Sequence, residues 1–96
     1  MSKIRKVVWT NTAKDQLKTI YNYYKEKSLQ GAINLKNDVL SSTKGIRFVE
    51  QYQKDEIEPE YRRIIVRDYK ILYLEENEVV YITKIFATKR DSLKQI

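Results

Sequence analysis

Basic side chains gather in three places along this sequence, and they are the residues best suited to chemistry. The chain has 96 residues, and its 19 Lys and Arg outnumber 13 Asp and Glu, giving a net charge of +6 at pH 7. Clustered cations bind phosphate groups or acidic surfaces, so an anionic partner is expected, whether RNA, DNA, an acidic protein or a membrane surface. The three groups are Lys3, Arg5 and Lys6; then Arg62, Arg63, Arg67 and Lys70; and then Lys84, Lys89, Arg90 and Lys94.

Two residue types that carry much of enzyme chemistry are missing. The sequence has no histidine and no cysteine, so it can build neither a Ser-His-Asp nor a Cys-His arrangement and lacks the commonest zinc ligands. Its two glycines cannot form a glycine-rich phosphate loop. We therefore expect no metal and no cofactor, and any catalysis must rely on Arg, Lys, Tyr or carboxylates.

RNA cleavage is a reaction that such cations could catalyse. Arginine stabilises the charged transition state while the 2′-hydroxyl attacks, but a fixed cation cannot move protons. The available proton carriers are lysines and tyrosines with an ordinary pKa of about 10, so base catalysis at neutral pH requires a large downward shift. Tyrosines at alternate strand positions are also more typical of packing than of base stacking. These carriers are Lys70, Lys84, Lys89, Tyr61, Tyr69, Tyr73 and Tyr81.

An acidic run gives a second set of candidates for proton transfer. Glu56, Glu58 and Glu60 recur at alternate positions, and paired carboxylates can share acid–base work. An acidic run beside Pro59 is more typical of a solvated loop, which is what we expect here.

The first part of the chain predicts a strand followed by a helix. Residues 4–9 are rich in β-branched and aromatic types, so they predict a strand that ends in a core residue, Trp9. Thr12 is the expected N-cap of the helix, with Asp15 as the capping-box acid and an end near Lys27. The buried stripe of this helix recurs at spacings of three and four. Its members are Ala13, Leu17, Ile20, Tyr21 and Tyr24.

A second helix and a long loop should follow. The pattern breaks at residues 28–31, and helical spacing then runs from Ala32 to Ile46, with Gly45 as a terminator. Two helices joined by a short link form an antiparallel hairpin. Residues 47–60 have no clear period and predict a loop, with a short extended piece over residues 49–52.

The last part of the chain predicts a sheet. YRRIIV, YKILYL and VVYITKIF alternate with a period of two, and their short links make neighbouring strands antiparallel. The order β-α-α-β-β-β predicts an α+β fold in one domain over residues 1–96, with a helical hairpin packed on one face of a small antiparallel sheet. The other face would stay partly open and carry Arg62 or Arg63, Lys70 and Lys84.

The sequence resembles the RelE/ParE toxin superfamily in the order and spacing of its motifs. One motif has the form W-T-x-x-A-x-x-x-L-x-x-I-x-x-Y, and a second helix, YRRIIVRDYKILY and VVYITKIFATKRD follow it. The resemblance covers nearly the whole chain and implies the β-α-α-β-β-β fold of these toxins. The first motif consists of Trp9, Thr10, Ala13, Leu17, Ile20 and Tyr23 or Tyr24.

The resemblance implies the toxin half of a type II toxin–antitoxin pair, which inhibits bacterial growth until an acidic antitoxin neutralises it. It implies a cytoplasmic protein with no membrane partner, which reaches operator DNA only through the antitoxin. RelE-like members cut messenger RNA on the ribosome without a metal, and ParE-like members act on DNA gyrase. By position, Arg62 or Arg63, Lys70 and Arg90 match the catalytic basic residues of the RelE-like members, with Lys70 where arginine is usual.

The C-terminus departs from the RelE-like pattern. The residues after Arg90 read DSLKQI and contain neither the tyrosine nor the histidine that RelE-like endoribonucleases use. We therefore expect a ParE-like toxin that acts on DNA gyrase. The alternatives are a RelE-like messenger-RNA endoribonuclease and a non-toxic nucleic-acid-binding module. The expected target-binding surface consists of Arg62, Arg63, Arg67, Lys70, Lys84, Lys89 and Arg90.

Overall fold

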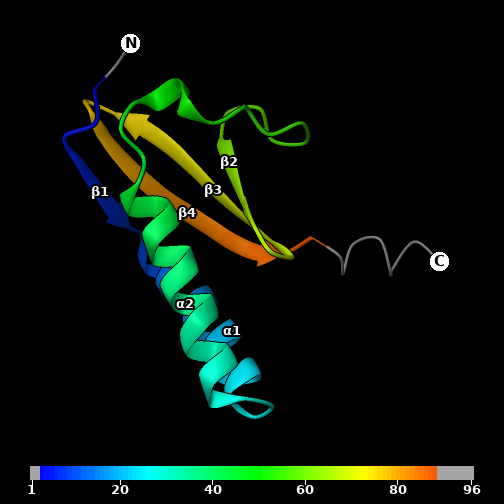
Figure 1. Ribbon diagram of the computed structural model, residues 1–96. Helices are drawn as coiled ribbons and strands as arrows, with labels where there is room; N and C mark the ends of the chain where they lie inside the picture. Colours follow the sequence, from blue (N-terminus) through cyan, green and yellow to red (C-terminus); the bar gives the residue numbers. More distant parts are fainter. Residues whose placement is uncertain (1–2, 89–96) are drawn as a thin grey trace.

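The computed structural model describes residues 3–88 and has the expected α+β order (Figure 1). No helix in this part of the chain is long and apolar enough to cross a membrane. The elements are β1 (Lys6–Trp9), α1 (Asn11–Lys25), α2 (Leu29–Lys44), the short 3-10 helix η1 (Val49–Gln51), β2 (Arg62–Val66), β3 (Tyr69–Glu76) and β4 (Val79–Ala87).

The sheet has the strand order β1-β4-β3-β2. Strands β2, β3 and β4 form the predicted antiparallel meander, because two-residue links reverse the chain between them. Strand β1 differs from the prediction of an all-antiparallel sheet, since it pairs in parallel with β4. The intervening helical hairpin makes this pairing geometrically feasible, because parallel neighbours need a long connection between them.

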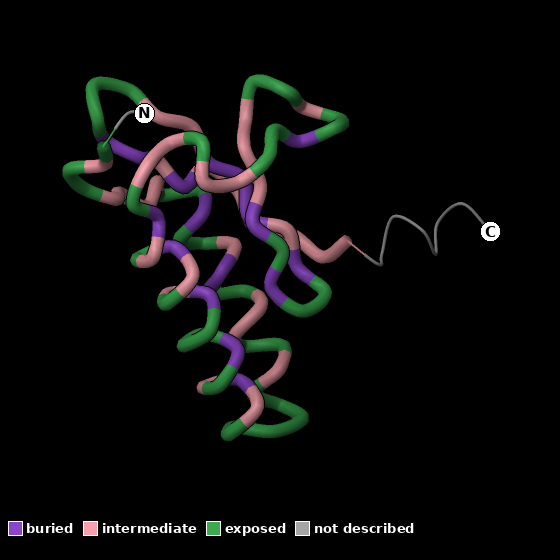
Figure 2. The backbone as a smooth tube through the Cα atoms, turned by 45° about the horizontal axis from the view of Figure 1, so that its top comes forward, coloured by how far each residue is buried: buried purple, intermediate pink, exposed green. Residues whose placement is uncertain are grey.

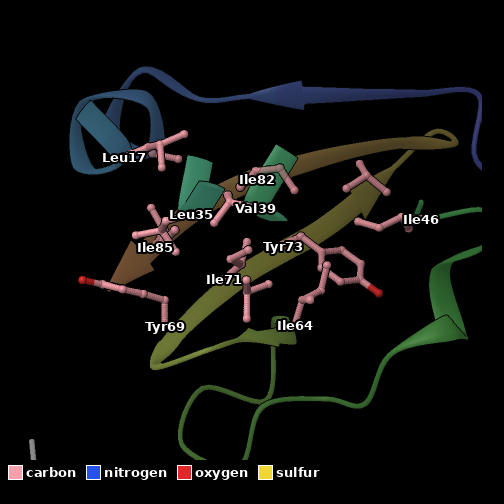
Figure 3. Close-up of a cluster of buried hydrophobic side chains, with 13 residues drawn as sticks. Leu17, Leu35, Val39, Ile46, Ile64, Tyr69, Ile71, Tyr73, Ile82 and Ile85 are labelled. Atoms are coloured by element: carbon pink, nitrogen blue, oxygen red, sulfur yellow. The ribbon is translucent and has the colours of Figure 1, made fainter. Parts of the chain in front are cut away.

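Both helices cover one face of the sheet, and the core lies between the two layers (Figure 3). Helix α1 packs over β4, and α2 reaches β2. Each helix contributes one buried stripe, seen as buried segments that alternate with exposed ones along the hairpin (Figure 2). The fully buried side chains Leu35, Ile71 and Tyr73 come from α2 and β3. The helical hairpin therefore packs on one face of the sheet, as the spacing of apolar residues in the sequence predicts.

The N-cap of α1 is Thr10, so the predictions of Thr12 as the cap and Asp15 as its partner were wrong. The Thr10 hydroxyl accepts a hydrogen bond from the Ala13 N–H at 3.2 Å and donates one to the Ile82 carbonyl oxygen at 2.9 Å. Thr12 is exposed within the helix. Thr10 therefore joins the start of α1 to the middle of β4, a contact that local sequence does not reveal.

Two further boundaries differ from the prediction. Helix α2 begins at Leu29, because the Ser28 hydroxyl caps it by accepting a hydrogen bond from the Gly31 N–H at 3.0 Å. It ends at Lys44, with the predicted terminator Gly45 as its C-cap. The segment expected to be extended forms η1 instead. The Gln51 side chain explains this turn, since it accepts from the Arg47 N–H at 2.8 Å and donates to the Gly45 carbonyl oxygen at 3.1 Å.

Replacing Thr10 should cost stability in a way that replacing Thr12 does not. Thr10→Ala removes an N-cap, which typically lowers the free energy of unfolding by about 1–2 kcal/mol. Thr12→Ala is the matched control and should change it by less than about 0.5 kcal/mol, since alanine suits a helix interior. Urea denaturation followed by circular dichroism measures both values. Equal losses in the two variants would contradict the assignment of the cap.

Candidate functional site

The face of the sheet away from the helices, here called the open face, carries two rows of side chains set by strand register. In the first row Arg63 pairs with Leu72, and Leu72 pairs with Lys84. Directly paired residues lie on the same face of a sheet. The second row contains Lys70, between Ile65 and Phe86. Three of the expected target-binding residues are thus brought together here.

Two other expected residues lie on the helix side of the sheet. Arg62 pairs with the core residue Tyr73, and its Nη1 donates to the Tyr52 carbonyl oxygen at 2.7 Å. Arg67 follows β2 and forms an ion pair with Asp38 of α2. The predicted single surface is therefore divided between two faces, and Arg63 rather than Arg62 lies on the open face. Lys89 and Arg90 lie outside the described residues.

Residues 53–61, here called the acidic strap, run beside the start of β2 (Figure 1). The Arg63 N–H donates to the Gln53 carbonyl oxygen at 3.0 Å and holds the strap at the outer edge of the sheet. The Asp55 N–H donates to the Tyr61 carbonyl oxygen at 2.9 Å and closes the strap into a compact loop. Asp55 is buried in this loop, whereas Glu56 and Glu60 are exposed, in agreement with the solvated loop predicted for the glutamates.

The Asp55 carboxylate is the counter-ion of the open face. Its side chain is 1% exposed, Lys70 Nζ donates to it at 2.8 Å, and Arg63 Nη1 lies 3.9 Å away. The N–H groups of Ile57 and Glu58 also donate to it, at 3.2 and 2.9 Å. Burial alone would raise the Asp55 pKa, but these hydrogen bonds, chiefly that from Lys70, hold the pKa below its usual value.

A second strap carboxylate neutralises the other end of the first row. Glu58 accepts a hydrogen bond from Lys84 Nζ at 3.0 Å, and the same ammonium lies 5.4 Å from the centre of the Tyr61 ring. Leu72, between Arg63 and Lys84, is fully buried although it does not face the helices. Cations on the open face are therefore engaged by the protein's own carboxylates.

The proton carriers with a resolved pKa shift are moved away from base catalysis. The hydrogen bond to Glu58 raises the Lys84 pKa, whereas a lysine base needs a lowered one. Burial raises the pKa of Tyr69 and of Tyr73 to about 12. Both tyrosines belong to the core, which confirms their expected packing role. Of the glutamates that were candidates for an acid–base pair, Glu58 is bound to Lys84, while Glu56 and Glu60 are exposed.

A separate hollow of about 370 Å³ lies where the end of β1 meets the two helices, and we call it the hairpin groove. Sequence reasoning missed it, because it assigned Trp9 and Tyr21 to the buried core. Both are only half-buried, and Lys14 and Lys18 beside them on α1 were the available signal. The groove is lined by Trp9, Lys14, Leu17, Lys18, Tyr21, Lys36 and Leu40.

Asp55→Asn should destabilise the fold by about 1.5–3 kcal/mol, since it removes the charged hydrogen-bond partner of Lys70. The folded-state pKa of Asp55 is depressed, so its stabilisation is fully present above the unfolded value of about 3.9 and is lost as pH falls through the folded pKa. The stability difference between wild type and variant should therefore shrink below about pH 4 in urea titrations.

The control for Asp55→Asn is Glu56→Gln in the same strap. The Glu56 side chain is 85% exposed and lies 3.7 Å from Arg63, so its removal should cost less than about 1 kcal/mol. A loss for Asp55→Asn that is no larger than this, or that persists unchanged at pH 2, would show that Asp55 does not anchor the strap.

Comparisons with known proteins give a likeness of fold and a family. A structure described as the chromosomal ParDE TA system from P. aeruginosa matches with a TM-score of 0.72, covering 91% of this chain and 98% of that one at 17% identity, a likeness of fold. No curated protein gives a significant sequence match. The family model for the ParE toxin of the type II toxin–antitoxin system parDE matches residues 7–92. The chain therefore belongs to the ParE toxin family of type II toxin–antitoxin systems.

Proposed function

We propose that this toxin inhibits bacterial growth by acting on DNA gyrase and that an acidic antitoxin neutralises it. Family membership supports the toxin role. The observation that carries the choice of target is the pairing of Lys70 with Asp55 and of Lys84 with Glu58 on the open face. These pairs leave the open face poorly suited to binding and cleaving RNA.

An RNA-cleaving face needs cations that are free to contact phosphates and a group that takes a proton at neutral pH. Here the Asp55 carboxylate contacts two cations where a phosphate would have to bind. The raised pKa of Lys84 opposes a role as general base. The absence of histidine from the sequence removes the side chain that most often fills that role. These features are more compatible with a protein target, such as gyrase, than with RNA.

The net charge of the chain and its family membership both support an acidic antitoxin as the partner. The net charge of +6 favours an acidic protein, and electrostatic steering speeds the association of such a pair. In this role the toxin acts in the cytoplasm, together with gyrase and antitoxin, and contacts operator DNA only through the antitoxin. The family description, which names a type II toxin–antitoxin system, supports an antitoxin partner.

Purified protein should inhibit the supercoiling of relaxed plasmid by DNA gyrase and should produce no codon-positioned cuts in a translating extract. The reason is that the cations of the open face are engaged by Asp55 and Glu58 and cannot assemble an RNA-cleaving centre. A gel-based supercoiling assay measures the first effect, and primer extension on the messenger measures the second. Adding the product of the adjacent gene should restore supercoiling.

The competing functions predict different results. Codon-positioned cuts that disappear in Arg90→Ala, with supercoiling unaffected, would make the protein a metal-independent endoribonuclease. Normal bacterial growth at confirmed soluble expression would remove the toxin function. If that result came with RNA affinity that falls steeply with salt, the protein would be a non-toxic nucleic-acid-binding module.

A further inference from the structure

The acidic strap contacts the open face through charged side chains, while its isoleucine faces solvent. Asp55 lies 2.8 Å from the ammonium of Lys70 on β3. Glu58 lies 3.0 Å from the ammonium of Lys84 on β4. Ile57, between the two acids, is 78% exposed. A segment that only extended the hydrophobic core would bury its isoleucine and leave its carboxylates in water. The strap instead meets the sheet as a phosphate backbone would, with anions placed on cations.

Each of the two lysines also lies beside an aromatic ring. Lys70 Nζ is 5.8 Å from the centre of the Phe86 ring, and Lys84 Nζ is 5.4 Å from that of Tyr61. Both rings are only half-buried. Proteins bind single-stranded nucleic acid through this combination, because cations hold the phosphates and accessible rings stack on the bases. The chemistry of the open face therefore fits a single-stranded nucleic acid better than a small anion.

We propose that the open face is a binding site for single-stranded nucleic acid that the acidic strap keeps closed, with Asp55 and Glu58 in place of two phosphate groups. This inference goes beyond the proposed function. A basic toxin that must find a protein target would otherwise be held by the nucleic acid of the cell, which binds clustered cations without regard to sequence. The strap removes that competition by pairing the cations within the molecule.

Removing the two strap charges should open the site. The variant Asp55→Asn/Glu58→Gln keeps the size of both side chains but removes the carboxylates that contact the two lysines. The probe is a fluorescently labelled single-stranded oligouridylate, titrated by fluorescence anisotropy at several salt concentrations. The variant should bind it at least about fivefold more tightly than wild type, and the slope of log affinity against log salt should steepen by about 1.4, because each of two new phosphate contacts contributes about 0.7.

Two controls separate the site from a simple gain in net charge. Asp15→Asn/Glu26→Gln makes the same charge change at exposed positions on α1 and should raise affinity less than about twofold, since it adds no contact on the open face. Adding Lys70→Gln/Lys84→Gln to the strap variant should return affinity and slope to the wild-type values. Thermal melting confirms that each variant folds.

The variant Glu58→Gln keeps the test decisive if the double strap variant does not fold. The side chains of Lys84 and Glu58 are 38% and 32% exposed, so loss of this pair costs little stability. Its slope should steepen by about 0.7, with Glu26→Gln as the control.

Unchanged affinity and slope in a folded strap variant would overturn the proposal. An equal gain in the α1 control, or a gain that persists without the two lysines, would overturn it as well. Neither gyrase nor an antitoxin enters these titrations, so their result is independent of whether the proposed function holds.

Discussion

The buried carboxylate of Asp55 determines how the cations on the open face of the sheet are paired. A charge removed from water must be matched by opposite charge and hydrogen bonds, and Asp55 receives both from Lys70 and from the backbone of its own strap. On the same face Leu72, which pairs with Arg63 and Lys84, is fully buried. The row of Arg63, Leu72 and Lys84 is therefore engaged within the protein, although Ile65 on the same face is exposed.

Charge is consequently distributed unevenly over a protein that is basic as a whole. The cations of the sheet are largely satisfied within the molecule, including Arg67, which is paired with Asp38 of α2. The lysines beside the hairpin groove have no such partners within residues 3–88. The clusters of basic residues in the sequence point to the cations of the sheet. In the part of the chain that the structure describes, positive charge that is free of salt bridges lies instead on the lysines beside the hairpin groove.

The sequence was sufficient to predict elements and layers, because periods of 3.6 and 2 directly determine which side of a helix or strand is buried. The sequence was insufficient where a residue far along the chain determines a helix cap or the face on which a side chain lies. Thr10 and Thr12 are similar caps by sequence, and the choice depends on the Ile82 carbonyl far along the chain. Alternation likewise leaves Arg62 and Arg63 equivalent until pairing with Tyr73 assigns Arg62 to the helix side. The ion pairs between the acidic strap and the sheet also join residues far apart in the sequence, so they could not be predicted from local pattern.

The strand order also has a consequence for how the chain is made. Strand β4 lies between β1 and β3, yet it is the last strand to be synthesised among those in residues 3–88. While the nascent chain waits for it, β1 has no neighbour and the apolar stripe of α1 has no sheet to cover. The pairing of β1 with β4 therefore cannot form until β4 has been synthesised, and long-range pairing of this kind is slow and leaves apolar surface exposed in the meantime. A truncated product that lacks β4 would be a target for proteolysis rather than a smaller toxin.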